Sequence, residues 1–170
     1  IIVDSELGSG STFTIFLPIS QSGKKPQSYQ LQKHPRGTET ILFVDDEASI
    51  TKFAQRMLQQ LGYTVETRTS SNEALELFRT QPEYFDLVIT DMTMPNMTGD
   101  KLAIELMRIR PEIPVILCTG YSKKISDDRA AAIGIRGFAY KPMVKADLAK
   151  TVRKVLDEAK SSSQSPFRCS

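Results

Sequence analysis

Short apolar runs and amphipathic stretches alternate along most of this chain. Five runs of apolar and β-branched residues are typical of strands buried on both faces of a parallel sheet. They lie at 41–44, 63–67, 85–90, 115–118 and 137–140. After each run, apolar residues recur at the spacing of an amphipathic helix. The pattern therefore predicts an α/β fold of five strands and five helices, with a parallel sheet covered on both faces.

The expected helices differ in how clearly their ends are marked. The first carries an apolar stripe that includes Phe53, and Gly62 closes it. Ser70 and Glu73 form a capping-box pattern, which predicts the start of the second helix. The fourth, around residues 123–133, has the least regular pattern. Right-handed crossovers leave few arrangements of such a chain, and functional groups then gather at the carboxyl ends of the strands.

The composition divides the chain into four segments. Residues 1–19 are apolar and β-branched, whereas residues 20–39 consist mainly of Gln, Ser, Lys, Gly and Pro, which is typical of a linker. The strand–helix alternation occupies residues 40–160. Residues 161–170 are rich in Ser and are expected to form a disordered tail. Because the chain begins with Ile1 and not Met, we interpret it as a piece of a longer protein.

The charge balance and the cysteines exclude several classes of protein. The chain has 22 basic and 20 acidic residues, so it lacks the basic excess of a nucleic-acid-binding domain. Cys118 and Cys169 lie far apart and are expected to be reduced thiols in a cytoplasmic protein. The apolar stretches are too short to span a membrane, and no secretory signal is visible. We therefore expect a cytoplasmic fragment with no membrane contact of its own, although its parent protein is compatible with a membrane anchor.

Chemically active side chains follow four of the predicted strands. Asp45-Asp46 follows the first strand, Asp91 the third, Thr119 the fourth and Lys141 the fifth. Crowded carboxylates repel one another, so a site of this kind favours a divalent cation, and oxygen ligands suit Mg²⁺. A carboxylate can also attack phosphorus and form an aspartyl phosphate. The edge of the sheet is therefore a candidate phosphoryl-transfer site.

These motifs give residues 40–160 a specific resemblance. They are Asp45-Asp46-Glu47, the run from Asp91 to Gly99, Thr119-Gly120 and Lys141-Pro142. Together they resemble the receiver domain of bacterial response regulators in two-component systems. The resemblance implies a flavodoxin-like fold, which is a doubly wound five-stranded parallel sheet of order 2-1-3-4-5.

The resemblance also implies a role for each residue at the site. Asp91 resembles the phosphoacceptor, which takes a phosphoryl group from a phosphohistidine. Asp45, Asp46, Asp91 and the backbone carbonyl of Thr93 resemble the Mg²⁺ site, with Asp45 often acting through water. Lys141 resembles the lysine that pairs with the phosphoryl group.

Further positions resemble those that change conformation on phosphorylation and those that set the lifetime of the phosphoryl group. Thr119 resembles the switch hydroxyl, and Phe138 lies at the position of the switch aromatic, although a plain core aromatic is the alternative interpretation. The resemblance implies that phosphorylation changes the face formed by helix four, strand five and helix five. Thr93 and Tyr121 would tune the lifetime of the phosphoryl group, because both would border the path of an attacking water.

Residues 1–19 carry a second resemblance. The run 5–18 resembles the closing hairpin of the ATPase domain of a sensor histidine kinase. The resemblance implies a hybrid sensor histidine kinase as the parent and its phosphodonor domain as the partner. A second expected partner is a histidine phosphotransfer protein. The fragment itself is expected to have no kinase activity beyond self-phosphorylation and autodephosphorylation, and His34 is interpreted as an incidental linker residue.

Other interpretations of the same residues stay open. A stand-alone response regulator or a phosphorelay intermediate would have the same receiver motifs. A Mg²⁺-dependent phosphatase with an aspartate nucleophile is a different class, but such enzymes carry a second acid where this chain has Thr93. A flavin-binding module fits poorly, because the acidic residues from Asp45 to Glu47 would repel a phosphate. The stimulus, the downstream partner, the phosphoryl lifetime and the oligomeric state are not indicated by the sequence.

Overall fold

The computed structural model describes residues 1–17, 34–120 and 132–163, and it divides the chain into two compact units. The first unit is Ile1–Lys33 and the second is His34–Ser170. Within the described residues, no helix combines the length and the apolar content that a membrane crossing requires.

The first unit contains an antiparallel hairpin. Strand β1 (Ile2–Glu6) pairs with strand β2 (Gly10–Thr14), and Val3 lies opposite Phe13. The turn between them places Gly8 and Gly10 at positive φ angles, which glycine adopts without steric strain. The side chains of both strands are exposed on this hairpin.

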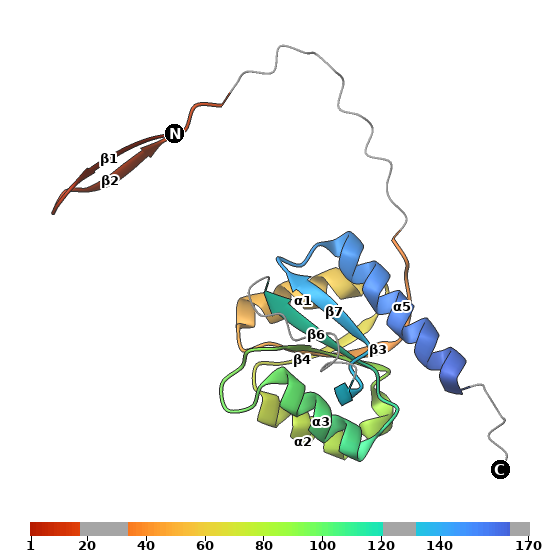
Figure 1. Ribbon diagram of the computed structural model, residues 1–170. Coiled ribbons are helices and arrows are strands. Elements are labelled where there is room, and N and C mark those ends of the chain that lie inside the picture. The colour runs from red at the N-terminus through yellow and green to blue at the C-terminus, as the bar shows by residue number, and fades with distance from the viewer. Residues whose placement is uncertain (18–33, 121–131, 164–170) are drawn as a thin grey trace, which may run out of the picture. The chain divides into compact units, whose positions relative to one another are not determined.

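The second unit is built on a five-stranded parallel sheet (Figure 1). Its strands are β3 (Thr40–Val44), β4 (Thr64–Arg68), β5 (Leu87–Asp91), β6 (Val115–Gly120) and β7 (Gly137–Lys141). Their order in space is β4-β3-β5-β6-β7, and every neighbouring pair is parallel. In the numbering of the five-strand pattern this is 2-1-3-4-5, so the predicted fold and strand order are confirmed.

Helices cover both faces of this sheet, as Figure 1 shows. Helices α1 (Ala48–Gln60) and α5 (Lys145–Ser163) pack on one face, and α2 (Ser71–Thr80) and α3 (Gly99–Ile109) pack on the other. A short 3-10 helix, η1 (Pro82–Tyr84), precedes β5. Most of the helix expected around residues 123–133 lies outside the described residues, although residues 132 and 133 are helical.

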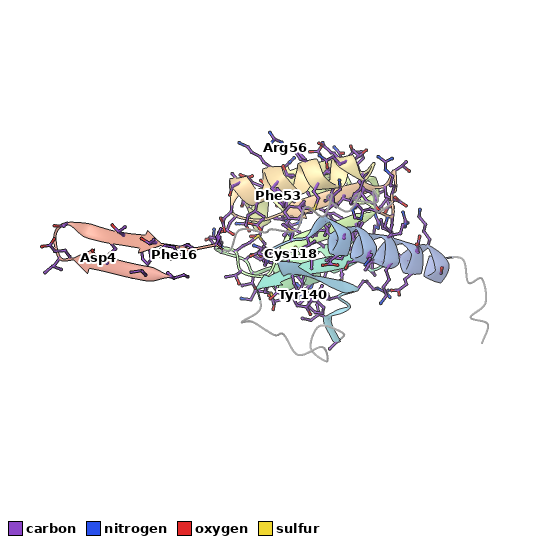
Figure 2. All side chains as sticks on the ribbon, turned by 90° about the horizontal axis from the view of Figure 1, so that it is seen from above. Asp4, Phe16, Phe53, Arg56, Cys118 and Tyr140 are labelled. Carbon is purple, nitrogen blue, oxygen red and sulfur yellow. The ribbon has the colours of Figure 1, made fainter. Side chains whose placement is uncertain are left out.

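The helix ends follow from local sequence. Ser70 caps α2, since its hydroxyl accepts a hydrogen bond from the Glu73 N–H at 3.5 Å. Gly62 ends α1 at a φ of 100°, and its N–H donates to the carbonyl of Gln59. The prediction that Phe53 lies on the buried stripe of α1 is wrong, because 55% of this residue is exposed (Figure 2).

The phase of α1 explains the position of Phe53. The buried face of α1 begins with Thr51 and Ala54, which are 3% and 0% exposed. Met57 and Leu58, which are also buried, continue this face of the helix. Phe53 precedes Ala54 by one residue, which rotates it about 100° away around the helix. Its ring therefore points off the contact surface.

A buried ion-pair cluster holds the chain where it enters the second unit. Glu39 accepts two hydrogen bonds from the Arg153 guanidinium, at 3.0 and 3.1 Å, and one from Lys160 at 2.6 Å. Burial raises the pKa of the Glu39 carboxyl, but the bonds from these two cations outweigh burial and lower it from 4.5 to about 2. The Gly37 N–H also donates to the carbonyl of Leu61 at 3.1 Å. We call Glu39, Arg153 and Lys160 the amino-edge clamp, because they lie where β3 begins.

Candidate phosphoryl-transfer site

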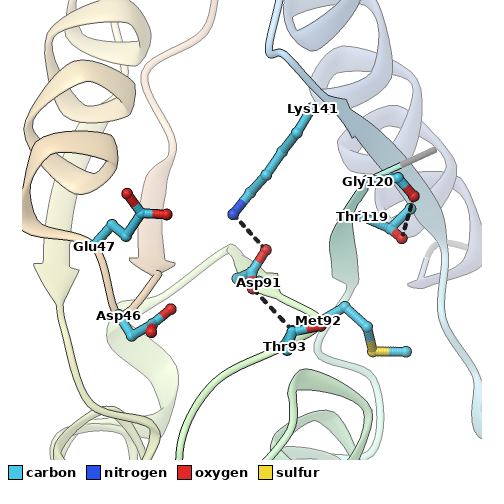
Figure 3. Close-up of a pocket in the computed structure, with 8 residues that line it drawn as sticks. All are labelled: Asp46, Glu47, Asp91, Met92, Thr93, Thr119, Gly120 and Lys141. Atoms are coloured by element: carbon cyan, nitrogen blue, oxygen red, sulfur yellow. Dashed lines mark hydrogen bonds and ion pairs between the residues drawn. The ribbon is translucent and has the colours of Figure 1, made fainter. Parts of the chain in front are cut away.

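The opposite edge of the sheet holds a cleft of about 320 Å³ (Figure 3). The turns and strand ends after β3, β5, β6 and β7 supply its walls, because the carboxyl ends of parallel strands meet at one edge. The residues that line the cleft are Asp46, Glu47, Asp91, Met92, Thr93, Thr119, Gly120 and Lys141. Five of the residues singled out from the sequence are thus brought together: Asp46, Asp91, Thr93, Thr119 and Lys141.

Lys141 joins two carboxylates at the base of this site. Its Nζ lies 2.6 Å from Asp91 Oδ1 and 2.8 Å from Asp45 Oδ2. Burial lowers the pKa of Lys141, but hydrogen bonds to Asp45 and Asp91 outweigh it and raise the pKa above its ordinary value. The lysine is therefore a permanent cation at the centre of the acidic group.

Asp91 is fixed in position through both of its carboxylate oxygens. Oδ1 pairs with Lys141, and Oδ2 accepts a hydrogen bond from the Thr93 N–H at 2.8 Å. The residue is only 6% exposed, yet it lines the cleft. A side chain held at two points and reached from one side is suited to act as a nucleophile on a group that enters the cleft.

Gly99, at the start of α3, lets the loop that follows β5 fold back under Asp91. The Gly99 N–H donates to the carbonyl of Met92 at 3.1 Å at the start of α3. A Cβ at position 99 would clash with the backbone carbonyl of Asp91. The glycine in the run from Asp91 to Gly99 is therefore required by close packing of the backbone under the site.

The two acids after β3 differ in accessibility. Asp45 is 0% exposed and is absent from the cleft lining, since Oδ1 accepts the Glu47 N–H at 3.0 Å and Oδ2 accepts Lys141. Asp46 is exposed and lines the cleft. The turn that follows β3 thus buries the first carboxylate and presents the second.

The oxygen atoms that line the cleft suit Mg²⁺, which needs few protein ligands, better than a metal whose ligands are all protein side chains. Within residues 1–17, 34–120 and 132–163, no three His, Cys, Asp or Glu side chains are grouped closely enough to hold a metal ion. The cleft instead presents the carboxylates of Asp46 and Asp91 near Thr93. Mg²⁺ usually takes one or two carboxylates and keeps several waters, which matches this arrangement.

Thr119 lines the cleft, whereas Phe138 lies outside it. The Thr119 hydroxyl donates to the carbonyl of Gly120 at 3.2 Å. Phe138 is partly buried on β7 and lines a different cavity, of about 460 Å³, together with the first half of α5. Tyr121, the predicted lifetime residue, lies outside the described residues. The roles of Thr119, Phe138 and Tyr121 stay predictions.

Two residues at the site received no role from the sequence. Glu47 lines the cleft, and it was quoted only as the third acid of a motif. Its position as a separate wall of the cleft depends on the turn before α1, which periodicity does not describe. Cys118 pairs in register with Asp91, and burial, followed by the charge of Asp91, raises the pKa of its thiol to about 12. Cys118 is therefore a neutral packing residue beside Asp91 on the neighbouring strand.

The second unit matches a family model. The model of the response regulator receiver domain matches residues 41–153, about two thirds of the chain. Two solved structures resemble the unit at appreciable sequence identity. A receiver domain protein from Clostridium thermocellum has a TM-score of 0.69 and 31% identity, over 73% of this chain and 98% of that one. A CheY-like receiver domain protein from Methanospirillum hungatei JF-1 has a TM-score of 0.67 and 28% identity, over 74% and 99%.

Curated relatives extend the comparison beyond this unit. The sensor kinase CckA of Brucella abortus (strain 2308) is 35% identical over 167 residues, which covers 93% of this chain and 18% of the relative. A probable transcriptional regulator, ycf27, of Porphyra purpurea is 36% identical over 121 residues, which covers 71% and 49%. The chain thus spans less than half the length of each. An alignment over 93% of the chain cannot be confined to the receiver match and must enter the residues before it.

Proposed function

This chain belongs to the response regulator receiver domain family, and from that premise we propose that it takes a phosphoryl group from a phosphohistidine onto Asp91. The observation that supports the proposal is the fixed position of the Asp91 carboxylate in the cleft. It lines an acidic cleft, and Lys141 Nζ and the Thr93 N–H hold its two oxygens at 2.6 and 2.8 Å. A nucleophile with this fixed geometry needs little reorganisation before it attacks.

The transfer exchanges one bond to phosphorus for another. A carboxylate oxygen of Asp91 bonds to phosphorus, while the bond from phosphorus to the donor's imidazole nitrogen breaks and the nitrogen keeps the electron pair. Mg²⁺, when bound by Asp46, Asp91 and the Thr93 carbonyl, neutralises negative charge on the transferring group. Lys141 would supply positive charge beside Asp91. Thr119, which lines the cleft, would turn its hydroxyl from the Gly120 carbonyl to donate a hydrogen bond to a phosphoryl oxygen.

Asp45 has a supporting role in this scheme. Both of its oxygens already accept hydrogen bonds, from Glu47 and from Lys141. It therefore positions Lys141 and acts on the cation through water, while Asp46 faces the cleft directly. Phosphorylation would then draw Lys141 and Thr119 toward the new phosphoryl oxygens. These two movements, with one of Phe138, would change the predicted face formed by helix four, β7 and α5.

We infer that the parent protein is a hybrid sensor histidine kinase. The similarity to the sensor kinase CckA supports this, because that alignment reaches into the residues that precede the receiver. The hairpin of β1 and β2 is consistent with the closing hairpin of a kinase ATPase domain. The phosphodonor would then be a histidine of the same parent protein, with onward transfer to a histidine phosphotransfer protein.

Intact-mass spectrometry tests the phosphoacceptor directly. The chain is incubated with acetyl phosphate and Mg²⁺, beside Asp91→Asn and a control, Glu83→Gln, whose exposed acid lies in η1 at the other edge of the sheet. We expect one added phosphoryl group in the wild type and in the control, and none in Asp91→Asn or without Mg²⁺.

Two results would contradict the proposal. One is a phosphoryl group that persists in Asp91→Asn, which would place the acceptor elsewhere. The other is failure of the wild type to bind beryllofluoride, the stable analogue of a phosphoryl group, which would show that the cleft is inactive. Continuous release of phosphate from a simple aryl phosphate would instead favour an aspartate-dependent phosphatase.

A further inference from the structure

Ion pairs join the same two parts of the receiver at both edges of its sheet. At the carboxyl edge, Lys141 Nζ lies 2.8 Å from Asp45 Oδ2. At the amino edge, Arg153 Nη2 lies 3.0 Å from Glu39 Oε1. Glu39 and Asp45 flank β3, whereas Lys141 is the last residue of β7 and Arg153 lies within α5. One ion pair thus joins the end of β3 to β7, and the other joins the start of β3 to α5, so β3, β7 and α5 form a closed frame.

The amino-edge clamp makes this frame stiff. The side chain of Glu39 is 8% exposed, and Lys160 adds a second cation about two turns further along the same face of α5. A Cβ at Gly37 would clash with the Glu39 carboxylate, Tyr63 and Arg153, so the backbone of the entering chain lies directly against the clamp. Close-packed interiors transmit displacements because they have little free volume. The entering chain and α5 therefore move together.

Lys141 is the member of the frame that phosphorylation acts on. It is shared between Asp45 and Asp91, and α5 begins shortly after it at Lys145. A phosphoryl group on Asp91 adds oxygen acceptors for the ammonium group, in competition with Asp45. Weakening the Lys141–Asp45 pair releases one end of the frame. α5, whose Leu148 and Val152 are packed in the core, then carries the displacement of Lys141 toward Arg153.

We propose that the phosphorylation state of Asp91 is coupled to the amino-edge clamp, so that a phosphoryl group at one edge loosens the chain's entry at the other. This rests on the proposed phosphoacceptor function. The coupling is reciprocal, since each event must change the equilibrium of the other by the same factor. Loosening the clamp by mutation therefore makes binding of a phosphoryl analogue tighter.

Beryllofluoride binding tests the coupling in one direction. Its Kd is measured by calorimetry in saturating Mg²⁺ for the wild type, Glu39→Gln and the milder Lys160→Met. The matched control is Lys154→Met, which removes an exposed lysine of α5 that pairs only loosely, at 3.9 Å, with Glu158. We expect the Kd to fall about threefold to tenfold in both clamp variants and to stay unchanged in the control.

Hydrogen exchange tests the reciprocal direction. In the wild type, beryllofluoride should speed exchange of the Gly37 amide, which is bonded to the Leu61 carbonyl, and of the Thr64 amide, which is bonded to Glu39. An equal or weaker affinity in folded clamp variants, or unchanged exchange at both amides, overturns the coupling. Failure of the wild type to bind beryllofluoride overturns the phosphoacceptor function instead, so the two failures are distinguishable.

Discussion

Two ionic clusters lie at opposite edges of one sheet, and their charge balances differ. At the amino edge, Arg153 pairs with the carboxylates of Glu39 and Asp157. Lys160 also pairs with Glu39, so two acids meet two cations. At the carboxyl edge, one ammonium group, Lys141, lies between Asp45 and Asp91, and two more acids line the cleft beside it. The first cluster meets its own charge requirement. The second has surplus negative charge beside an open cleft.

The comparison teaches how to separate a structural cluster from a binding site. Both clusters contain buried carboxylates and short ion pairs, so neither burial nor distance distinguishes them. The charge balance does, because surplus negative charge beside an open cleft attracts a cation from solution. The amino-edge clamp should therefore contribute to folding stability, whereas the acidic cleft should contribute to binding.

Removing the centre of the clamp should have the largest effect on stability. The Arg153→Met substitution leaves Glu39 buried with only Lys160 as its partner. Because Lys160 still compensates the charge, the cost is that of lost hydrogen bonds to a charged group, about 2–3 kcal/mol. Chemical denaturation measures the free energy of unfolding. Lys154→Met on the same helix should change it by less than about 0.5 kcal/mol. A loss in Arg153→Met as small as that of the control would mean that the clamp is as weak as a surface pair.

Acid should remove the same stabilisation in a defined pH window. The folded protein holds the pKa of Glu39 at about 2, below its ordinary 4.5, so it binds fewer protons than the unfolded chain between these values. The contribution is thus complete above pH 4.5 and is lost as the pH falls through about 2. A shift of this size corresponds to roughly 3 kcal/mol.

Parallel denaturation curves check this window. The free energies of unfolding of the wild type and Glu39→Gln are compared from pH 7 down to the acid transition. The difference between them should be constant above pH 4.5 and should shrink below it. A difference that grows as the pH falls would contradict the assignment of the lowered pKa to the clamp.

The fold was predictable because its information is local. A parallel strand covered on both faces favours a continuous apolar run, and Leu87, Val88 and Ile89 of β5 are all buried. The capping hydroxyl of Ser70 was likewise visible from the residues around it. The exception, Phe53, shows the limit of periodicity. An apolar repeat gives the period of a helix, but close packing at Ala54 decides which side faces the sheet.

The candidate site was predictable only in part. Strand ends fix which residues meet at the carboxyl edge, so Asp91 and Lys141 could be placed together in advance. Their roles, with those of the other site residues, stay predictions. The turn after β3 decides that Asp45 is buried and that Glu47 lines the cleft, and no repeat describes that turn. The pairing of Glu39 with Arg153 spans 114 positions in the chain, which no local pattern reveals.

The smallest expected effect sharpens the comparison at the carboxyl edge. Glu47 lines the cleft at the start of α1, and its side chain makes no capping hydrogen bond there. Among the described residues no partner is seen for its carboxylate, so its charge remains available to a cation. We expect Glu47 to act on a bound divalent ion at longer range than the ligands, so the Glu47→Gln substitution should weaken Mg²⁺ binding by about threefold to tenfold.

Calorimetric titration with Mg²⁺ alone measures this change without any phosphodonor. Glu83→Gln removes the same charge at the other edge of the sheet and should leave the Kd for Mg²⁺ unchanged. Glu47→Asp keeps the charge and should restore most of the affinity. If Glu47→Asp binds Mg²⁺ as weakly as Glu47→Gln, the effect comes from packing at the start of α1. The surplus charge of the cleft would then rest on Asp46 and Asp91, and the contrast between the two edges would be smaller than the lining residues indicate.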